Sequence, residues 1–105
     1  VEPDTSAVLS GEPSGPHKLQ GIGAGFIPDT LDTKIIDEII KIGAQEAYEA
    51  GKALPKEEGF LVGISAGAAL AAATQLAKLP ENKGKNIVVL LPDSGDRYLS
   101  SEMFA

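Results

Sequence analysis

The stretch from residue 59 to residue 78, GFLVGISAGAALAAATQLAK, constrains the fold more than any other part of the chain. It opens with a short apolar run, turns at the small residues GISAG and continues as a segment rich in alanine. This succession predicts a strand, a tight turn and a helix. The turn places Ser65 between the carboxyl end of the strand and the amino end of the helix, where open α/β sheets bind ligands. The many alanines allow this helix to lie very close to a sheet or to a flat ligand.

Composition and charge exclude several classes of function. The 105 residues suit one small domain, and the net charge of −6 argues against nucleic acid as a partner. No apolar run approaches the roughly 18–20 residues that a membrane helix needs. The chain has no cysteine and one histidine, so no thiolate or multi-histidine metal site is expected within it. Because the first residues are Val1-Glu2-Pro3 rather than methionine, we expect the chain to be a piece of something longer.

The remaining elements follow from periodicity. Val1-Glu2-Pro3 reads as the end of a strand, and the clearest helix covers residues 45–58, although Pro55 should kink it or end it early. Residues 31–42 fit a helix nearly as well as a strand, but the β-branched run at 39–42 favours a short strand. The run NIVVLL at 86–91 predicts a buried parallel strand. With the strand at 60–62, the order is βαβαβ with right-handed crossovers in an open α/β sheet.

The GISAG turn allows three interpretations. It fits the G-x-S-x-G nucleophile elbow, and its expected strand-to-helix context is right. Acyl transfer by that motif needs a histidine after the serine, whereas the only histidine, His17, precedes it. Two interpretations therefore stay open: a small-residue turn that serves close packing, and a cofactor site in which the Ser65 hydroxyl bonds a ligand atom.

Two further segments are candidates for the same site. Residues 21–25 hold three glycines, which indicates close backbone approach or positive φ; the dinucleotide pattern is excluded because Phe26 stands where a glycine is required. This stretch is either a flexible surface loop or a loop that closes on a substrate. The polar turn at 92–96 holds ordinary turn formers, but it follows a predicted strand beside the Ser65 turn and so is a candidate for lining the same cleft.

Taken together, the strings GPHKLQGIGAGFIP, EEGFLVGISAGAALAAA and NIVVLLPDSGDRYLSSEMF resemble the C-terminal part of cysteine synthase (O-acetylserine sulfhydrylase). The resemblance runs along all 105 residues. It implies a cytoplasmic, homodimeric pyridoxal 5′-phosphate enzyme of the tryptophan synthase β-like fold (fold type II). Such an enzyme makes L-cysteine from O-acetyl-L-serine and sulfide by β-replacement through an α-aminoacrylate. Cystathionine β-synthases are similar around GISAG but usually lack the GPHK stretch, so they are the alternative enzyme.

The resemblance also implies roles for particular residues. Ser65 matches the serine that bonds the pyridine nitrogen, with Gly63, Pro92 and Asp93 near the cofactor. The segment that moves as the active site closes holds Gln20, Gly21, Ile22 and Gly23. His17 and Lys18 match residues near the groove for the C-terminal peptide of serine acetyltransferase.

The same resemblance describes the chain as the C-terminal part of the cofactor-binding catalytic region. The family's Schiff-base lysine and phosphate loop belong to segments outside residues 1–105, so the chain alone is expected to be inactive. The residues depart from the family at Ala66, where a second serine is common, and at Glu12, near a commonly basic position. A non-catalytic module that docks a peptide on the same fold remains the alternative from another class.

Overall fold

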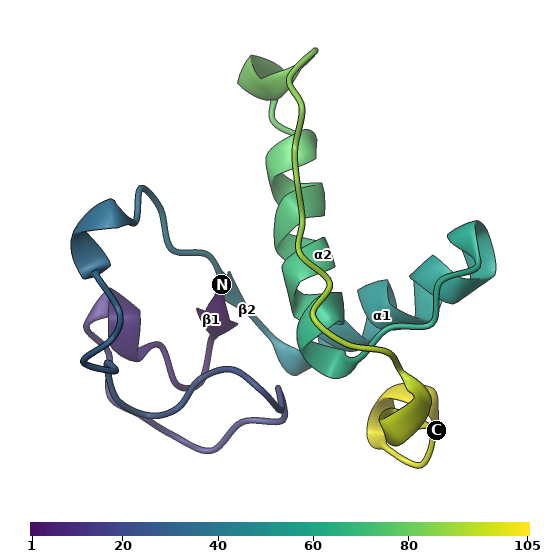
Figure 1. The fold of residues 1–105 in the computed structure, drawn as a ribbon, viewed down its shortest axis with the longest axis horizontal. Coiled ribbons are helices and arrows are strands. Elements are labelled where there is room, and N and C mark those ends of the chain that lie inside the picture. The colour runs from purple at the N-terminus through teal and green to yellow at the C-terminus, as the bar shows by residue number, and fades with distance from the viewer.

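Two short strands and two helices form the frame of the molecule, which the computed structural model describes over residues 1–105. In chain order they are β1 (Glu2–Pro3), β2 (Lys41–Ile42), α1 (Ala44–Glu58) and α2 (Ile64–Ala77). Short 3-10 turns lie in the connecting segments, at Val8–Ser10, Thr33–Ile35, Pro80–Asn82, Asp96–Tyr98 and Glu102–Phe104. In Figure 1, α2 stands between the long loop that joins the strands on one side and α1 on the other.

The two strands pair in parallel, with Glu2 opposite Lys41 and Pro3 opposite Ile42. Both strands were expected from the sequence and are confirmed, although each has only two residues. β2 leads through Gly43 directly into α1, so the buried Ile42 is held beside the helix that follows. The sheet consists of these two strands alone.

The predicted helix over 45–58 is confirmed as α1, but it does not end early at Pro55. It continues to Glu58, and the Gly59 N–H donates to the Pro55 carbonyl at 3.1 Å. Pro55 begins the last turn, so its missing N–H removes a single helical hydrogen bond. Gly59 then closes the helix in the left-handed conformation at φ 80°, as C-terminal glycines commonly do.

The alanine-rich helix is confirmed as α2, and its small residues bring it against α1. A Cβ on Gly67 would lie only 2.3 Å from the carbonyl oxygen of Ala47 and 3.2 Å from the nitrogen of Gly51. The two helix backbones therefore approach each other at a place where side chains are absent. The close approach allowed by the small residues is made to another helix within these 105 residues.

Residues 86–91 form no strand, so the predicted parallel strand is wrong for this chain. The segment runs back along α2 (Figure 1), and Val88 and Leu90 are open to solvent, at 94% and 79% exposed, while Val89 and Leu91 are half-buried. The predicted strand at 60–62 is reduced to one antiparallel bridge between Val62 and Ser94. A strand exists only where a neighbour completes its hydrogen bonds, and β1 and β2 pair only with each other. The observed order is therefore one parallel pair followed by two helices, within the α/β class.

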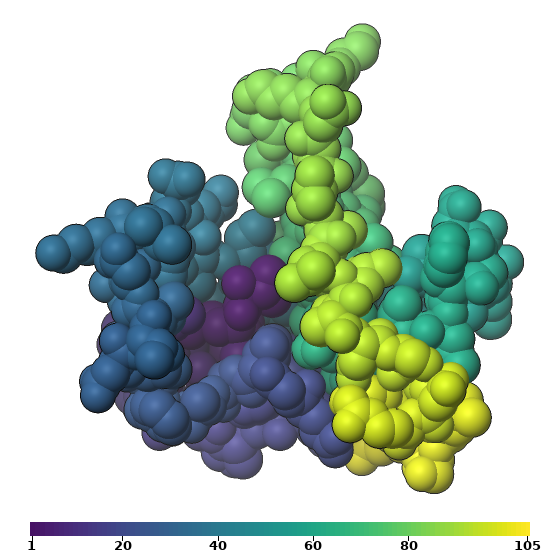
Figure 2. Space-filling model, in the orientation of Figure 1, coloured from purple at the N-terminus to yellow at the C-terminus, as the bar shows by residue number.

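The core is thin for a chain of this length. Only 17 of the 105 residues are buried, and the space-filling view shows α2 and the segment beside it standing out as a column (Figure 2). Neither helix is long and apolar enough to cross a membrane. The buried cluster lies where α1, α2, β2 and the C-terminal turn meet, and comprises Leu19, Ile42, Ala47, Ile64, Ala68, Ala72 and Met103.

Candidate functional site

A cleft of about 490 Å³ opens at the amino end of α2. Ser65 is the second residue of that helix, is half-buried and lines the cleft. The free N–H groups and the dipole of the first turn favour polar or anionic ligand atoms there. The predicted placement of Ser65 at a helix amino end is therefore confirmed. The other residues that line the cleft are Val1, Gly21, Ile22, Ala69, Leu90, Pro92, Asp93, Arg97 and Tyr98.

Asp93 joins the segment after residue 91 to the start of α2. The Gly63 N–H donates to the Asp93 carbonyl oxygen at 3.2 Å. A Cβ on Gly63 would stand 2.1 Å from Asp93 Oδ1, so only glycine fits at that position. Oδ1 itself is buried without a hydrogen-bond partner. Gly63 thus lies behind Asp93 and does not line the cleft, whereas the predicted Pro92 and Asp93 both do.

The second carboxylate oxygen of Asp93 is held by two donors from the following turn. Tyr98 Oη donates to Oδ2 at 2.8 Å, and Arg97 Nη2 lies 2.9 Å from the same atom. The hydrogen bond to Asp93, together with partial burial, raises the pKa of Tyr98 above its ordinary value. The phenol therefore stays protonated and continues to donate at neutral pH. Tyr98 and Arg97 were not among the predicted site residues, and only their spacing of five and four residues from Asp93 hints at this contact.

We call residues 20–25 the glycine loop. All three of its glycines have positive φ, and Gly21 at φ 98° is the one beside Ser65: a Cβ built there would lie 3.6 Å from Ser65 Oγ. The expected close backbone approach is therefore confirmed. Ile22 also lines the cleft, whereas Gln20 is exposed and Gly23 lies outside it.

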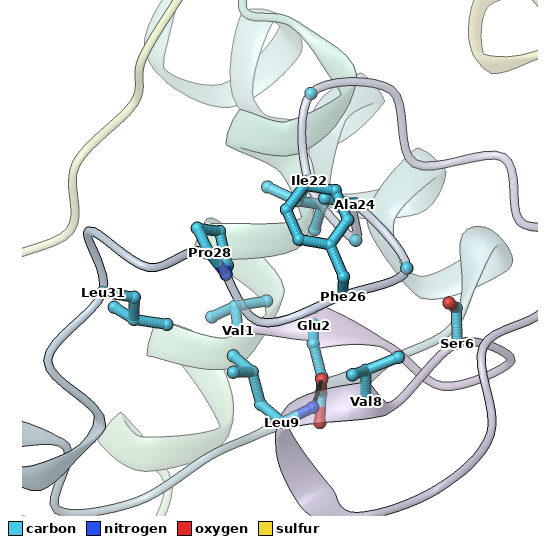
Figure 3. Close-up of a pocket in the computed structure, with 13 residues that line it drawn as sticks. Val1, Glu2, Ser6, Val8, Leu9, Ile22, Ala24, Phe26, Pro28 and Leu31 are labelled. Atoms are coloured by element: carbon cyan, nitrogen blue, oxygen red, sulfur yellow. Dashed lines mark hydrogen bonds between the residues drawn. The ribbon is translucent and has the colours of Figure 1, made fainter.

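A second cavity of about 480 Å³ lies on the other side of the glycine loop (Figure 3). Gly21 and Ile22 line both cavities, so this part of the loop forms a wall between them. The cavity is mostly apolar, with Phe26 lying across it in Figure 3. Its buried Glu2 carboxylate is already satisfied, because it accepts hydrogen bonds from the backbone N–H groups of Leu9 and Ser10 and from the Ser10 hydroxyl.

His17 and Lys18 are both engaged within the chain. His17 Nδ1 accepts from the Leu19 N–H at 3.1 Å, and its Nε2 lies 2.8 Å from the Gly23 carbonyl oxygen. Lys18 Nζ pairs with Glu102 at 2.8 Å, and this hydrogen bond raises the pKa of the lysine. Neither residue lines the Ser65 cleft.

No group of three or more histidine, aspartate or glutamate side chains is placed to hold a metal ion.

Residues 1–93 match the family described as pyridoxal-phosphate dependent enzyme. The chain belongs to this family. Members use pyridoxal phosphate, and the chain has the α/β fold of fold type II enzymes.

Several of the relatives most similar to the chain are cysteine synthases. The whole chain is 55% identical to cysteine synthase from Staphylococcus aureus (strain Mu50 / ATCC 700699) and spans 34% of that protein. The crystal structure of cysteine synthase (OASS) from Entamoeba histolytica superposes on 98% of the chain with a TM-score of 0.96 and 48% identity, covering 30% of that structure. The O-acetylserine dependent cystathionine β-synthase from Helicobacter pylori matches 99% of the chain and 33% of its own length, with a TM-score of 0.81 and 40% identity. The chain therefore spans about a third of the relatives it matches.

The residues around the cleft fit the ring of pyridoxal phosphate. Ser65 provides a neutral hydroxyl on one wall, while Gly21 and Ala69 leave room for a flat group. Asp93 Oδ1 lies against Gly63, which is outside the cleft, so this buried acceptor does not face a ligand bound there. Asp93 Oδ2 is already paired with Tyr98 and Arg97.

Proposed function

We propose that residues 1–105 are the C-terminal part of the catalytic region of a cysteine synthase that makes L-cysteine from O-acetylserine and sulfide. The observation that carries the proposal is the position of Ser65, at the amino end of α2 and facing the glycine loop across one cleft. The 55% identity over the whole chain to a cysteine synthase supports the same reaction.

Within this proposal Ser65 would hold the pyridine nitrogen of the cofactor. When bound, pyridoxal phosphate supplies an electron sink for the amino-acid substrate. A neutral hydroxyl does not keep the pyridine nitrogen protonated as a carboxylate would, so Ser65 makes that sink a weak one. A weak sink suits a reaction in which acetate leaves readily from the neighbouring carbon. The glycine loop would close over the substrate and exclude water.

The test uses the full-length enzyme that carries this chain, with Ser65→Ala and Ser65→Asp. Ser65→Ala should lose one hydrogen bond, about 1 kcal/mol or about fivefold in cofactor affinity, and should keep some activity. Ser65→Asp should change the absorption band of the bound cofactor. An acidic residue is favourable in the first turn of a helix, so this variant should still fold.

Thr74→Ala is the matched control, because its hydroxyl bonds the Leu70 carbonyl on the same helix and lies outside the cleft. It should leave cofactor binding and cysteine formation unchanged. If both Ser65 variants match the wild type in cofactor spectrum and in cysteine formation, the assignment of Ser65 is wrong.

The two alternatives predict different measurements. A cystathionine β-synthase-like enzyme would prefer homocysteine to sulfide as the sulfur donor, and a docking module would show no cofactor absorption. The Staphylococcus aureus cysteine synthase is 55% identical to the chain and the Helicobacter pylori cystathionine β-synthase 40%, which favours the first function. A higher rate with homocysteine than with sulfide would reverse this preference.

The remaining parts of the proposal concern the whole protein. We propose that Val88 and Leu90 are covered by the rest of a longer chain, because such exposed apolar side chains are costly in water. The amides of 86–91 should then exchange slowly with solvent in the full-length enzyme; rapid exchange would contradict this. We further propose that the enzyme is a homodimer, which sedimentation tests, and that it is cytoplasmic, which cell fractionation tests. We also propose that it binds the C-terminal peptide of serine acetyltransferase, which titration with that peptide tests.

A further inference from the structure

The side chain of His17 connects the two ends of the segment 19–23. Its Nδ1 accepts from the N–H of Leu19, and its Nε2 faces the carbonyl oxygen of Gly23. An amide N–H only donates and a carbonyl only accepts, so the ring carries its single proton on Nε2. Each ring nitrogen therefore bonds one backbone group, and the ring bridges Leu19 and Gly23 at the two ends of segment 19–23.

The two ends that His17 joins are themselves anchored. Leu19 is only 1% exposed and belongs to the buried cluster. Gly23 has φ 65°, and a Cβ there would lie 2.5 Å from Pro3 Cγ and 2.7 Å from His17 Nε2. His17 thus holds Gly23 against the end of β1, in a conformation that a larger residue would not adopt without strain.

Between Leu19 and Gly23, the backbone makes few other hydrogen bonds. The backbone of segment 19–23 has one further hydrogen bond, a long one of 3.4 Å from the Ile22 N–H to the Leu19 carbonyl. Gly21 and Ile22 nevertheless form the wall between the Ser65 cleft and the second cavity. His17 thus makes two of the three hydrogen bonds that hold this backbone, while the Ile22 side chain packs against the buried cluster.

We infer that His17 is a positioning residue for the reaction proposed above, on which this inference rests. It sets the place of Gly21 across from Ser65 and touches neither substrate nor cofactor, since it lies outside the cleft. The ring faces a separate, smaller hollow that includes Pro3, Thr5, Pro16 and Ile42.

Three substitutions in the full-length enzyme separate the two hydrogen bonds. His17→Asn places an amide oxygen near the Nδ1 position and keeps the bond to Leu19, whereas His17→Gln reaches the Nε2 position and keeps the bond to Gly23. His17→Phe keeps the ring volume and loses both. Thr5→Val is the matched control, because it removes the hydrogen bond from Thr5 Oγ1 to the Pro16 carbonyl beside His17 and leaves the loop untouched.

The first readout does not need activity. Amide exchange at Leu19 should accelerate in His17→Phe and His17→Gln but stay near the wild-type rate in His17→Asn and Thr5→Val. In the wild type, nitrogen chemical shifts should show a protonated Nε2 and an unprotonated Nδ1. The opposite tautomer, or a Leu19 amide equally protected in all variants, would overturn the inference.

The second readout is kinetic. With about 1 kcal/mol for each hydrogen bond, kcat/KM for cysteine formation should fall about fivefold in His17→Asn and His17→Gln and about 30-fold in His17→Phe. The absorption band of the bound cofactor should not change. Wild-type kcat/KM in a folded His17→Asn or His17→Gln enzyme, or an equal loss in Thr5→Val, would refute the positioning role. A wild type that makes no cysteine would instead refute the proposed function. Amide exchange at Leu19 would still report on the hydrogen bond between Leu19 and His17.

Discussion

Gly67→Ala is the substitution for which the structure predicts the sharpest effect. The methyl group would lie 2.3 Å from the Ala47 carbonyl oxygen, whereas an ordinary contact needs at least 3.4 Å. That oxygen belongs to the backbone of α1, so it cannot move aside by a side-chain rotation. The two helices would therefore have to separate by about 1.1 Å at this point.

The free energy follows from two opposing effects. Alanine in place of glycine favours a helix by about 1 kcal/mol. Overpacking costs about 1–3 kcal/mol, and the upper end applies because the obstacle is backbone. The net loss is about 2 kcal/mol, which lowers Tm by about 4–8 °C in a protein of a few hundred residues. Since Ser65 precedes Gly67 by two residues on α2, cofactor affinity should fall as well.

Gly51→Ala is the matched control on the facing helix. Its added methyl would meet Met103 Sδ at 2.6 Å, the end of a flexible side chain, and the Gly67 Cα only at 3.8 Å. Its net cost should therefore stay below about 1 kcal/mol once the helix preference of alanine is included. Thermal unfolding and cofactor titration of both full-length variants check this. If Gly67→Ala melted at the wild-type temperature, or if Gly51→Ala were the more harmful change, the backbone contact would not be what brings the helices together.

Three other changes test the site. Gly21→Ala should slow turnover with little change in Tm, because the methyl has room but positive φ costs about 1 kcal/mol; a large fall in Tm at an unchanged rate per folded molecule would argue for a packing role alone. Tyr98→Phe should lower stability by about 1 kcal/mol through loss of the bond to Asp93. Because the pKa of Tyr98 is raised, its contribution is complete below about pH 10 and is lost as the pH rises through the folded-state pKa, so the Tm difference between the two proteins should shrink only in that range. Lys18→Ala should weaken binding of an acetyltransferase peptide at low salt and less so at high salt, and removing its competitor by Glu102→Gln should strengthen that binding; equal affinity of all three proteins at low salt would exclude the lysine from the groove.

The helices and the place of Ser65 were predictable because their signals are local. Gly63 ends the extended stretch and the alanines that follow Ser65 favour a helix wherever they occur, so α2 begins where the sequence indicates. The glycine cluster predicted either positive φ or a close backbone approach, and Gly21 shows both. In each case the residues that specify the feature lie within a few positions of it.

The strand at 86–91 failed for the opposite reason. Its apolar run is suited to a buried strand, but a strand depends on hydrogen bonds to a neighbour, and none is placed beside it here. Val88 and Leu90 therefore remain exposed although their side chains are those of a sheet interior. Apolar character indicates a preference for burial without specifying what provides the cover.

The sequence by itself determined the helices and the family, because these rest on neighbouring residues or on strings long enough to be specific. Only the tertiary structure decided that His17 bonds Leu19 and Gly23 and that Tyr98 donates a hydrogen bond to Asp93. It also decided that the backbones of Gly67 and Ala47 approach each other closely. The physical reason is that a hydrogen bond or a contact depends on distances of a few ångströms, set by the path of the chain between its partners. Composition and periodicity carry no information on that path, so they predicted the place of Ser65 at the amino end of a helix but not the side chains that hold its surroundings in place.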